Sequence, residues 1–209
     1  MPSSNVFSSD TLLIDMDEKE ERSVQELRAL LTKRCDLSKA AAAFCTQHTL
    51  LRFYKAQRGD LVKACESLTQ TLEWRKDNVD GRVLQCPTCK VKPGSHSFQR
   101  VGSDLLNRPV IYGSPARASD PTVKPTVDHV VYALEEAFGK GGGGPGQWVW
   151  IVDLNGFQLK HALNIQLGLQ FASIFTKHYP ERLGIMLLIN PPLVFDILWK
   201  VPGPPPGIE

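Results

Sequence analysis

The sequence has no hydrophobic run long enough to cross a membrane. Its longest apolar stretches are Trp148–Val152 and Ile185–Ile189, whereas a transmembrane helix needs about 20 residues. The sequence also has no excess of one charge, because 24 Lys and Arg stand against 22 Asp and Glu, giving a net charge of +2. Nucleic-acid binders are usually clearly basic, so we expect no nucleic-acid partner.

The N-terminus lacks the features of a targeting signal. The apolar residues Leu12–Ile14 lie between Asp10 and Asp15, without a basic region or a long apolar core. The acidic run over residues 15–21 also argues against a mitochondrial presequence. Cysteine is scarce, with five dispersed residues, an odd number that gives no disulfide framework. A reducing compartment, the cytoplasm with its membrane surfaces, is therefore expected.

The composition is that of a folded protein. Hydrophobic residues make up 42% of the chain and charged residues 22%, which is ordinary for globular proteins. A length of 209 residues suits a small helical piece followed by one α/β domain. Residues 1–22 are polar and are expected to form a mobile arm, and residues 201–209 form a Pro/Gly-rich tail.

Residues 23–76 have the pattern of several short helices. Ser23 and Glu26 have the spacing of a capping box, which predicts that the first helix begins there. Gly59 is suited to end a helix, and Asp60 to cap the next one. The apolar residues of this segment recur at helical spacing, so each helix should bury one face in a shared core.

The next segment mixes turns with regular elements. Residues 77–100 carry turn signals without periodicity and are expected to form a loop. Arg108–Gly113 has the pattern of a short strand with a proline near its start. Pro125 is expected to open an amphipathic helix that Gly139 ends. The glycines of residues 141–144 indicate a flexible linker, since they precede a strand and lack the Gly-Lys-Ser/Thr ending of a phosphate loop.

The clearest architectural signal is a strand, a helix and a second strand. Trp148–Leu154 is almost entirely apolar, as in a strand that is buried on both faces. A helix of residues 162–178 follows, and Leu183–Ile189 is a second expected buried strand. Two strands joined through one helix should run parallel with a right-handed crossover.

Several segments together resemble one protein family. Leu50-Leu51-Arg52-Phe53 and Leu72-Glu73-Trp74-Arg75-Lys76 are similar to the helical N-terminal segment of CRAL-TRIO, or Sec14-like, lipid-binding proteins. Arg108–Tyr112 is similar to the family's Gly-Arg-Pro-Val strand. Asn107 stands where the family has glycine, and asparagine tolerates the left-handed conformation. The more specific matches are Ile151–Gly156, His178-Tyr179-Pro180-Glu181-Arg182-Leu183-Gly184 and Ile189–Pro192.

The resemblance implies a fold and a task. The fold is α/β, with a helical N-terminal segment (residues 23–76) and a Sec14-like βαβ sheet domain (residues 77–200) that is incomplete at its C-terminus. The expected task is non-enzymatic binding and transfer or presentation of a phospholipid, such as phosphatidylinositol, or of a similar hydrophobic molecule. The chain would meet membranes transiently, as a cytoplasmic protein that is peripheral at membranes. A helix beginning near Pro191 would be the door of the lipid pocket.

The resemblance also implies the site residues. Glu181 and Arg182 are candidates for contact with a lipid headgroup, although an ion pair at a helix end is the simpler interpretation. The door helix would contribute the apolar side chains of Leu193, Phe195, Leu198 and Trp199. An acyl chain gains about 0.8 kcal/mol for each buried CH₂ group, so an apolar cavity holds a lipid with few polar contacts.

Two departures from the family leave an alternative open. Gln57 replaces a basic residue of the family's phosphoinositide binders, so a headgroup phosphate would need Lys55 or Arg58 instead. The segment that closes the family domain, including the lysine partner of Glu181, has no counterpart after residue 200. A sheet edge and a pocket wall would then be uncovered and available to a protein partner. The alternative is thus a truncated interaction module that no longer closes a lipid pocket.

Other chemistry has weak support. Cys86-Pro87-Thr88-Cys89 with His96 has half of a zinc-ribbon spacing, but no second ligand pair is evident, so no metal is expected. The segment is also expected to be a loop that opens no helix, unlike a thioredoxin-like motif. Asp153 is expected to cap the turn that contains Gly156 rather than to act in catalysis. The histidines form no constellation with a nucleophile, and we expect neither an enzyme nor a cofactor.

Overall fold

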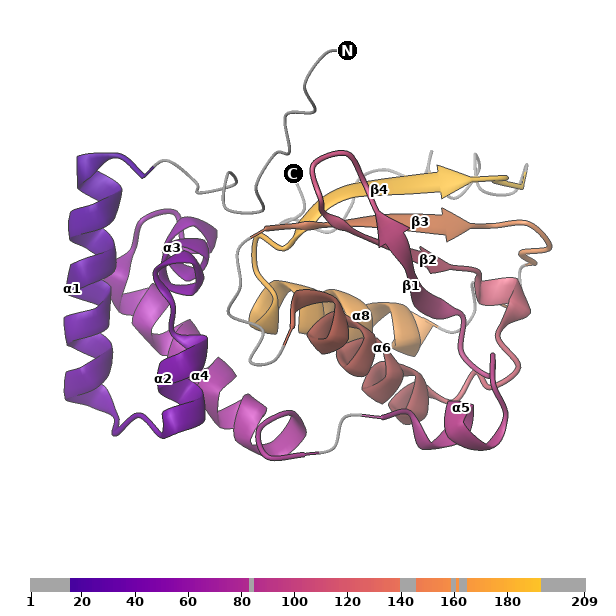
Figure 1. Cartoon of the computed structure of the whole chain (residues 1–209), viewed down its shortest axis with the longest axis horizontal. Helices are drawn as coiled ribbons and strands as arrows, with labels where there is room; N and C mark the ends of the chain where they lie inside the picture. The colour runs from indigo at the N-terminus through magenta and orange to yellow at the C-terminus, as the bar shows by residue number, and fades with distance from the viewer. Residues whose placement is uncertain (1–15, 83–84, 140–145, 159–160, 162–164, 193–209) are drawn as a thin grey trace, which may run out of the picture.

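The chain folds into a bundle of short helices beside an α/β sheet domain (Figure 1). The computed structural model describes residues 16–82, 85–139, 146–158, 161 and 165–192. The first four helices are α1 (Glu18–Arg34), α2 (Lys39–Phe44), α3 (Gln47–Ala56) and α4 (Leu61–Asn78). The elements that follow are α5 (Pro87–Val91), β1 (Phe98–Ser103), β2 (Pro109–Gly113), the 3₁₀ helix η1 (Pro115–Arg117), α6 (Val123–Phe138), β3 (Trp148–Asp153), α8 (Ile165–His178) and β4 (Leu183–Ile189).

Each of the four N-terminal helices begins at a polar cap. The side chains of Asp17, Ser38, Thr46 and Asp60 each accept a hydrogen bond from a backbone N–H of the first turn, which satisfies an otherwise unpaired donor. Gly59, with φ 86°, separates α3 from α4 as predicted. The prediction that the first helix begins at Ser23 is wrong, because Asp17 caps it six residues earlier.

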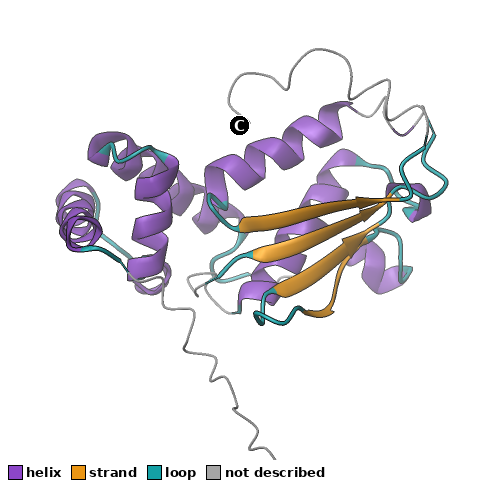
Figure 2. Cartoon of the chain, turned by 90° about the horizontal axis from the view of Figure 1, so that it is seen from above, coloured by secondary structure: helices purple, strands orange, loops and turns teal. Residues whose placement is uncertain are grey.

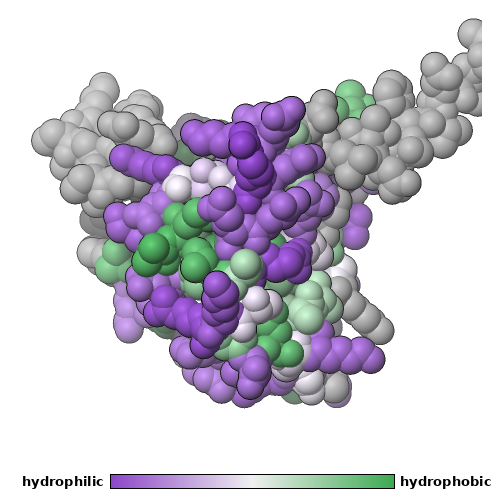
Figure 3. Space-filling view, turned by 90° about the vertical axis from the view of Figure 1, so that its left-hand side faces the viewer, coloured by the Kyte–Doolittle hydropathy of each residue, from purple (hydrophilic) through white to green (hydrophobic). Residues whose placement is uncertain are grey.

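The helical bundle has a core of its own, formed by apolar side chains from α1 to α4. Its buried members are Val24, Leu27, Leu31, Ala41, Phe44, Cys45, Leu50, Leu51, Phe53, Ala64, Cys65, Leu68 and Leu72. The outer face of the bundle is largely hydrophilic with small hydrophobic areas (Figure 3). Leu30 on α1 and Val62 on α4 are the large hydrophobic side chains that these two helices expose.

The sheet has four strands in the order β1-β2-β3-β4. β1 is antiparallel to β2, whereas β2, β3 and β4 run parallel. The predicted βαβ unit is therefore confirmed, with α8 as its helix. α6 and α8 lie together on one face of the sheet (Figures 1 and 2), as expected when successive crossovers of one hand move in one direction along a sheet.

The face of β3 that points toward α8 carries two tryptophans. The ring centroids of Trp148 and Trp150 each lie 5.6 Å from that of Phe175 on α8 and 5.6 Å from that of Phe98 on β1. Aromatic pairs in such edge-to-face arrangements add stability beyond their buried area. The buried members of this second core are Val79, Phe98, Ile111, Val130, Val131, Ala133, Leu134, Trp148, Ile174 and Tyr179.

Two elements lie where a loop was predicted. Helix α5 and strand β1 occupy part of residues 77–100. In β1 only Phe98 is buried and the other five residues are exposed, so the strand has no apolar alternation by which the sequence could reveal it. Asn107, in the turn between β1 and β2, has φ 58°, which is the left-handed conformation predicted for it.

The prediction that β4 is buried on both faces is wrong. Ile185, Met186, Leu187 and Ile189 are 39–47% exposed. Within the described residues β4 pairs with β3 alone. The register places Ile185 and Leu187 opposite Val149 and Ile151, on the face turned away from the tryptophans and α8. An apolar strip along β4 is therefore accessible at the surface.

A buried ionic network joins the helical bundle to the sheet domain. Arg75 on α4 donates from Nη1 and Nη2 to Oε1 and Oε2 of Glu135 on α6, at 2.9 and 3.0 Å. The Tyr179 hydroxyl donates to the same carboxylate at 2.8 Å, and the Arg75 guanidinium lies 4.1 Å from the Phe44 ring centroid. Burial raises the pKa of Tyr179 well above its ordinary value, so this hydroxyl remains a donor.

None of the helices in the described part of the chain combines the length and apolarity that a membrane crossing requires.

Removing the carboxylate of the buried network should destabilise the fold strongly. Glu135→Ala removes the carboxylate that both terminal nitrogens of Arg75 contact, so that Asp80, 3.6 Å from Arg75 Nε, is the acidic partner that remains. We expect a loss of about 3–5 kcal/mol in the free energy of unfolding. Glu136→Ala, at an exposed neighbouring position of the same helix, is the matched control and should change it by no more than about 0.5 kcal/mol. Urea unfolding of both variants measures the difference, and equal effects would contradict the role assigned to Glu135.

Candidate functional site

A cavity of about 510 Å³ lies between the sheet and the helices on its α6–α8 face. Pockets of about 300–1,000 Å³ are typical for bound small molecules. The cavity has mostly apolar walls, to which Phe98, Trp150, Val152, Leu167 and Phe171 contribute. The space that a hydrophobic cargo would require is thus present beneath the sheet.

The topology places this cavity at the carboxyl ends of parallel strands. Gly113 is the last residue of β2, and Val152 is the next-to-last residue of β3, and both line the cavity. Pro115 and Ala118, in the connection after β2, line it as well. Open α/β sheets bind their ligands in the crevice outside the carboxyl ends of the strands, so this position is the expected one for a ligand.

Two features of the cavity wall concern hydrogen bonding and close packing. The indole N–H of Trp150 is buried, and no acceptor for it lies among the described residues. A Cβ on Gly113 would lie 3.0 Å from the Ser97 carbonyl oxygen and 3.2 Å from Trp150 Nε1, so a larger residue here would crowd both neighbours. Buried donors are nearly always satisfied in proteins, which makes this indole a natural partner for a ligand oxygen.

A few polar side chains line the cavity beside its apolar walls. Asp120 accepts a hydrogen bond from the Thr122 N–H at 2.9 Å, and bonding to Thr122 lowers the pKa of this carboxyl below its ordinary value. His161 Nδ1 accepts from the Gln158 N–H at 2.8 Å. Asp120, Thr126 and His161 therefore place a few polar groups around a largely apolar hollow.

Asp153 has a structural role at the end of β3, which confirms its predicted place in a turn. Its carboxylate accepts hydrogen bonds from the Asn155 N–H at 3.0 Å, from the Asn190 side chain at 2.8 Å and from the Tyr112 hydroxyl. These bonds, with that from Asn190 foremost, lower the pKa of Asp153 to about 2. The residue fastens the ends of β2, β3 and β4 to one another.

The predicted headgroup residues lie at the opposite end of the parallel strands. Arg182, directly before β4, is buried, with its guanidinium 4.0 Å from the Phe138 ring centroid. Its Nη1 donates to the Gly146 carbonyl at 2.9 Å, and burial lowers its pKa to about 8. Glu181 is exposed, with φ 58°. The structure thus brings neither residue to the cavity, and their contact with lipid stays a prediction.

The remaining candidates of the sequence analysis are the four apolar residues of the expected door helix and Lys55. Leu193, Phe195, Leu198 and Trp199 lie outside the described residues, so their role in a door helix stays a prediction. Lys55, a substitute candidate for phosphate contact, forms an ion pair with Glu20 at 2.9 Å within the helical bundle.

The sequence interpretation missed the cavity residues themselves. Trp150 and Val152 could have been found, because alternate residues of a strand share one face. Phe98 gave no such signal, since β1 has no apolar pattern.

A cluster of sulfur and nitrogen ligands lies beside the cavity. Cys86, Cys89, His96 and His129 place one ligand atom each within 4.8 Å of one another, and His96 also lines the cavity. No metal was expected from the sequence, because Cys86 and Cys89 had no evident second pair of ligands. His129 on α6 completes that pair from a position 40 residues after Cys89, a distance at which no sequence spacing could reveal it. The segment also opens a short helix, α5, contrary to the prediction.

The structure is thus an α/β sheet domain with a cavity, preceded by a helical bundle. The family model described as "CRAL/TRIO domain" matches residues 96–204, and the chain belongs to this family. In fold it is similar to Sfh5, whose crystal structure superposes with a TM-score of 0.63 at 14% identity, over 88% of this chain and 75% of that one.

Curated relatives are similar over most of the chain. A CRAL-TRIO domain-containing protein of Schizosaccharomyces pombe is 26% identical over 177 residues, which cover 83% of this chain and 17% of the relative. Protein real-time of Aedes aegypti is 27% identical over 73% of this chain and 26% of its own length. The phosphatidylinositol transfer protein PDR17 of Saccharomyces cerevisiae is 25% identical over 70% of this chain and 45% of its own length. The chain therefore spans less than half of each.

The hydrogen bonds to Asp153 predict an acid-dependent contribution to stability. Because its pKa is lower in the folded state than its ordinary value of 3.8, the contribution is complete above about pH 4 and is lost as the pH falls toward 2. Asp153→Asn should therefore be less stable than the wild type at pH 7, with a difference that shrinks over this range. Urea midpoints at several pH values measure it, and a constant difference would contradict the assignment.

Proposed function

We propose that this protein binds one phospholipid or similar hydrophobic molecule in the cavity beneath the sheet and carries it between membranes without changing its bonds. The observation that carries the proposal is the apolar hollow between β3 and α8, lined by Trp150, Val152 and Phe171. A relative named as a phosphatidylinositol transfer protein supports a phospholipid as the ligand.

The energetics of the cavity favour an acyl chain. Each CH₂ group that leaves water gains about 0.8 kcal/mol, so an apolar chain that fills the hollow needs few polar contacts. The indole N–H of Trp150 offers a bond to an ester or headgroup oxygen. Asp120, Thr126 and His161 supply the polar surroundings that such a group requires.

Contact with a membrane surface belongs to the same proposal. A transfer protein must expose apolar surface when it collects or releases its cargo. The exposed side chains of Ile185 and Leu187 on one face of β4, and of Met186 on the other, offer apolar surface along this edge strand. Met186 is paired in register with Trp150, so the two side chains leave the same face of the sheet. We therefore propose a protein that is peripheral at cytoplasmic membranes.

An interaction module is the second candidate, favoured by the outer edge of β4. Within the described residues this edge has no neighbouring strand, and an unpaired apolar edge is suited to pairing with a partner chain. Lipid exchange that is absent from the native chain but restored by adding a complete family C-terminus would support this candidate over transfer.

Filling part of the cavity should weaken lipid binding. Leu167→Trp introduces a bulky ring into the cavity wall, and displacing only two CH₂ groups of a lipid removes about 1.6 kcal/mol, so we expect binding to weaken by at least about tenfold. Bound lipid is measured by extraction and mass spectrometry, and transfer by exchange of fluorescent phosphatidylinositol and phosphatidylcholine between vesicles.

The control is Leu169→Trp, which makes the same change on the same helix at a position that is 65% exposed. It should bind and exchange lipid as the wild type does. Circular dichroism and thermal unfolding of both variants establish that they are folded. A wild-type protein without extractable lipid and without exchange activity would refute the proposal, as would equal activity of the two variants.

A further inference from the structure

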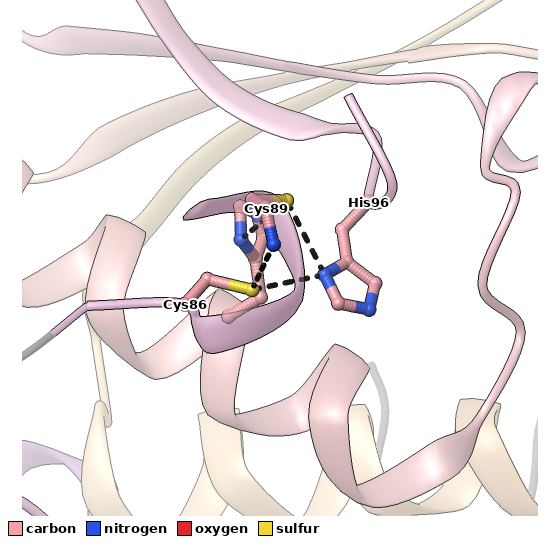
Figure 4. A group of neighbouring side chains, drawn as sticks. Cys86, Cys89 and His96 are labelled. Carbon is pink, nitrogen blue, oxygen red and sulfur yellow. Dashed lines mark hydrogen bonds between the residues drawn. The ribbon is translucent and has the colours of Figure 1, made fainter. Parts of the chain in front are cut away.

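Four side chains from three separate segments converge beside the cavity. Cys86 and Cys89 flank the first turn of α5, His96 lies shortly before β1, and His129 lies on α6. Figure 4 shows the two thiols and the His96 ring pointing toward one another. Neither a hydrophobic core nor a lipid pocket needs two sulfurs and two imidazoles in one place.

Three sulfur–nitrogen separations among these atoms are close to those around a tetrahedral ion, and all four ligand atoms lie within 4.8 Å of one another. Cys86 Sγ lies 3.2 Å and Cys89 Sγ 3.5 Å from His96 Nδ1, and Cys89 Sγ lies 3.7 Å from His129 Nδ1. A tetrahedral zinc ion with bonds of about 2.3 Å to sulfur and about 2.05 Å to nitrogen separates those ligand atoms by about 3.6 Å. The observed separations fall on both sides of this value.

The outer nitrogens of both histidines face oxygen atoms. His129 Nε2 lies 2.7 Å from the Phe98 carbonyl oxygen, and His96 Nε2 lies 3.5 Å from Asp120 Oδ2. Histidines that bind metals usually give their second N–H to a carbonyl or a carboxylate, which fixes the tautomer with the other nitrogen free to coordinate. In His129 this arrangement leaves Nδ1 for a metal. His96 Nε2 has no hydrogen-bond partner among the described residues, and the Nδ1 of this ring faces both sulfurs.

The surroundings of the sulfurs and the burial of the group also fit a structural metal site. The Cys89 backbone N–H lies 3.4 Å from Cys86 Sγ and donates to it, so that this sulfur caps the N-terminus of α5. Cys86, His96 and His129 are buried, and Cys89 is partly buried. Four protein ligands with little exposure to solvent are typical of structural zinc sites, whereas catalytic sites keep one position open.

We propose that Cys86, Cys89, His96 and His129 bind one zinc ion that ties α5 and the start of β1 to α6. The ion would hold in place a segment that has little regular structure and few buried side chains of its own. Helix α5 has only five residues, and β1 exposes all but one of its residues. It also fixes His96 and Phe98 in the wall of the cavity. The site stands independently of lipid binding.

Metal content of the purified full-length chain tests this proposal. Protein prepared with a thiol reductant and without chelators should contain about one zinc per chain, as measured by inductively coupled plasma mass spectrometry. Cys89→Ser should reduce this to below about a tenth of an equivalent, because one of the four ligands is lost. Cys35→Ser, which alters another partly buried thiol, at the C-cap of α1 in the helical bundle, should retain the zinc.

Cobalt substitution keeps the test decisive if Cys89→Ser folds poorly. Exchange of cobalt(II) into the wild-type chain should produce the intense visible bands of a tetrahedral ion and the charge-transfer band of a thiolate ligand. Either a wild-type chain that takes up neither metal, or a Cys86–Cys89 disulfide found by intact mass in the reduced preparation, would overturn the proposal. Equal zinc content in Cys89→Ser and Cys35→Ser would overturn it as well.

Discussion

The side chains on the helix-facing side of β3 determine where the domain is closely packed and where it has a cavity. Trp148, near the start of the strand, is completely buried between Phe98 and Phe175. Two and four residues later, Trp150 and Val152 line a cavity. One face of one strand therefore passes from close packing to a hollow, and the hollow lies at the carboxyl end where α/β sheets bind ligands. The proposed binding of a lipid depends on the hollow at this end of β3.

The elements around the cavity are held in place by polar contacts that are largely buried. Arg75, Glu135 and Tyr179 connect the helical bundle to α6 and to the segment before β4. Desolvation offsets much of the attraction in a buried ion pair, so its net contribution to stability is small, whereas loss of one partner is strongly destabilising. Asp153 fastens the strand ends beside the cavity, and the proposed zinc ion would fasten the wall at His96. The cavity is thus enclosed by fixed elements on several sides.

Most of the architecture could be predicted from the sequence, and the failures have physical causes. The parallel strands and their helices have strong apolar periodicity, so β3, α8 and β4 were found. β1 was missed because it buries only Phe98, and the exposure of β4 was missed because an apolar run does not reveal what covers it. The cavity and the cluster of two cysteines and two histidines are formed by residues that are far apart in the sequence and come together only in the folded chain. Family resemblance directed attention to Arg182, which the structure places at the other end of the strands.

The most direct measurement of the central claim is a crystal structure of the protein loaded with a phospholipid whose acyl chains carry bromine. Anomalous scattering would locate the bromine atoms without reference to any prior interpretation of the cavity. The account predicts bromine peaks between Trp150, Val152 and Phe171, beneath the sheet. Peaks confined to the outer surface of β4, or a cavity that is filled by its own side chains in the presence of the lipid, would contradict it.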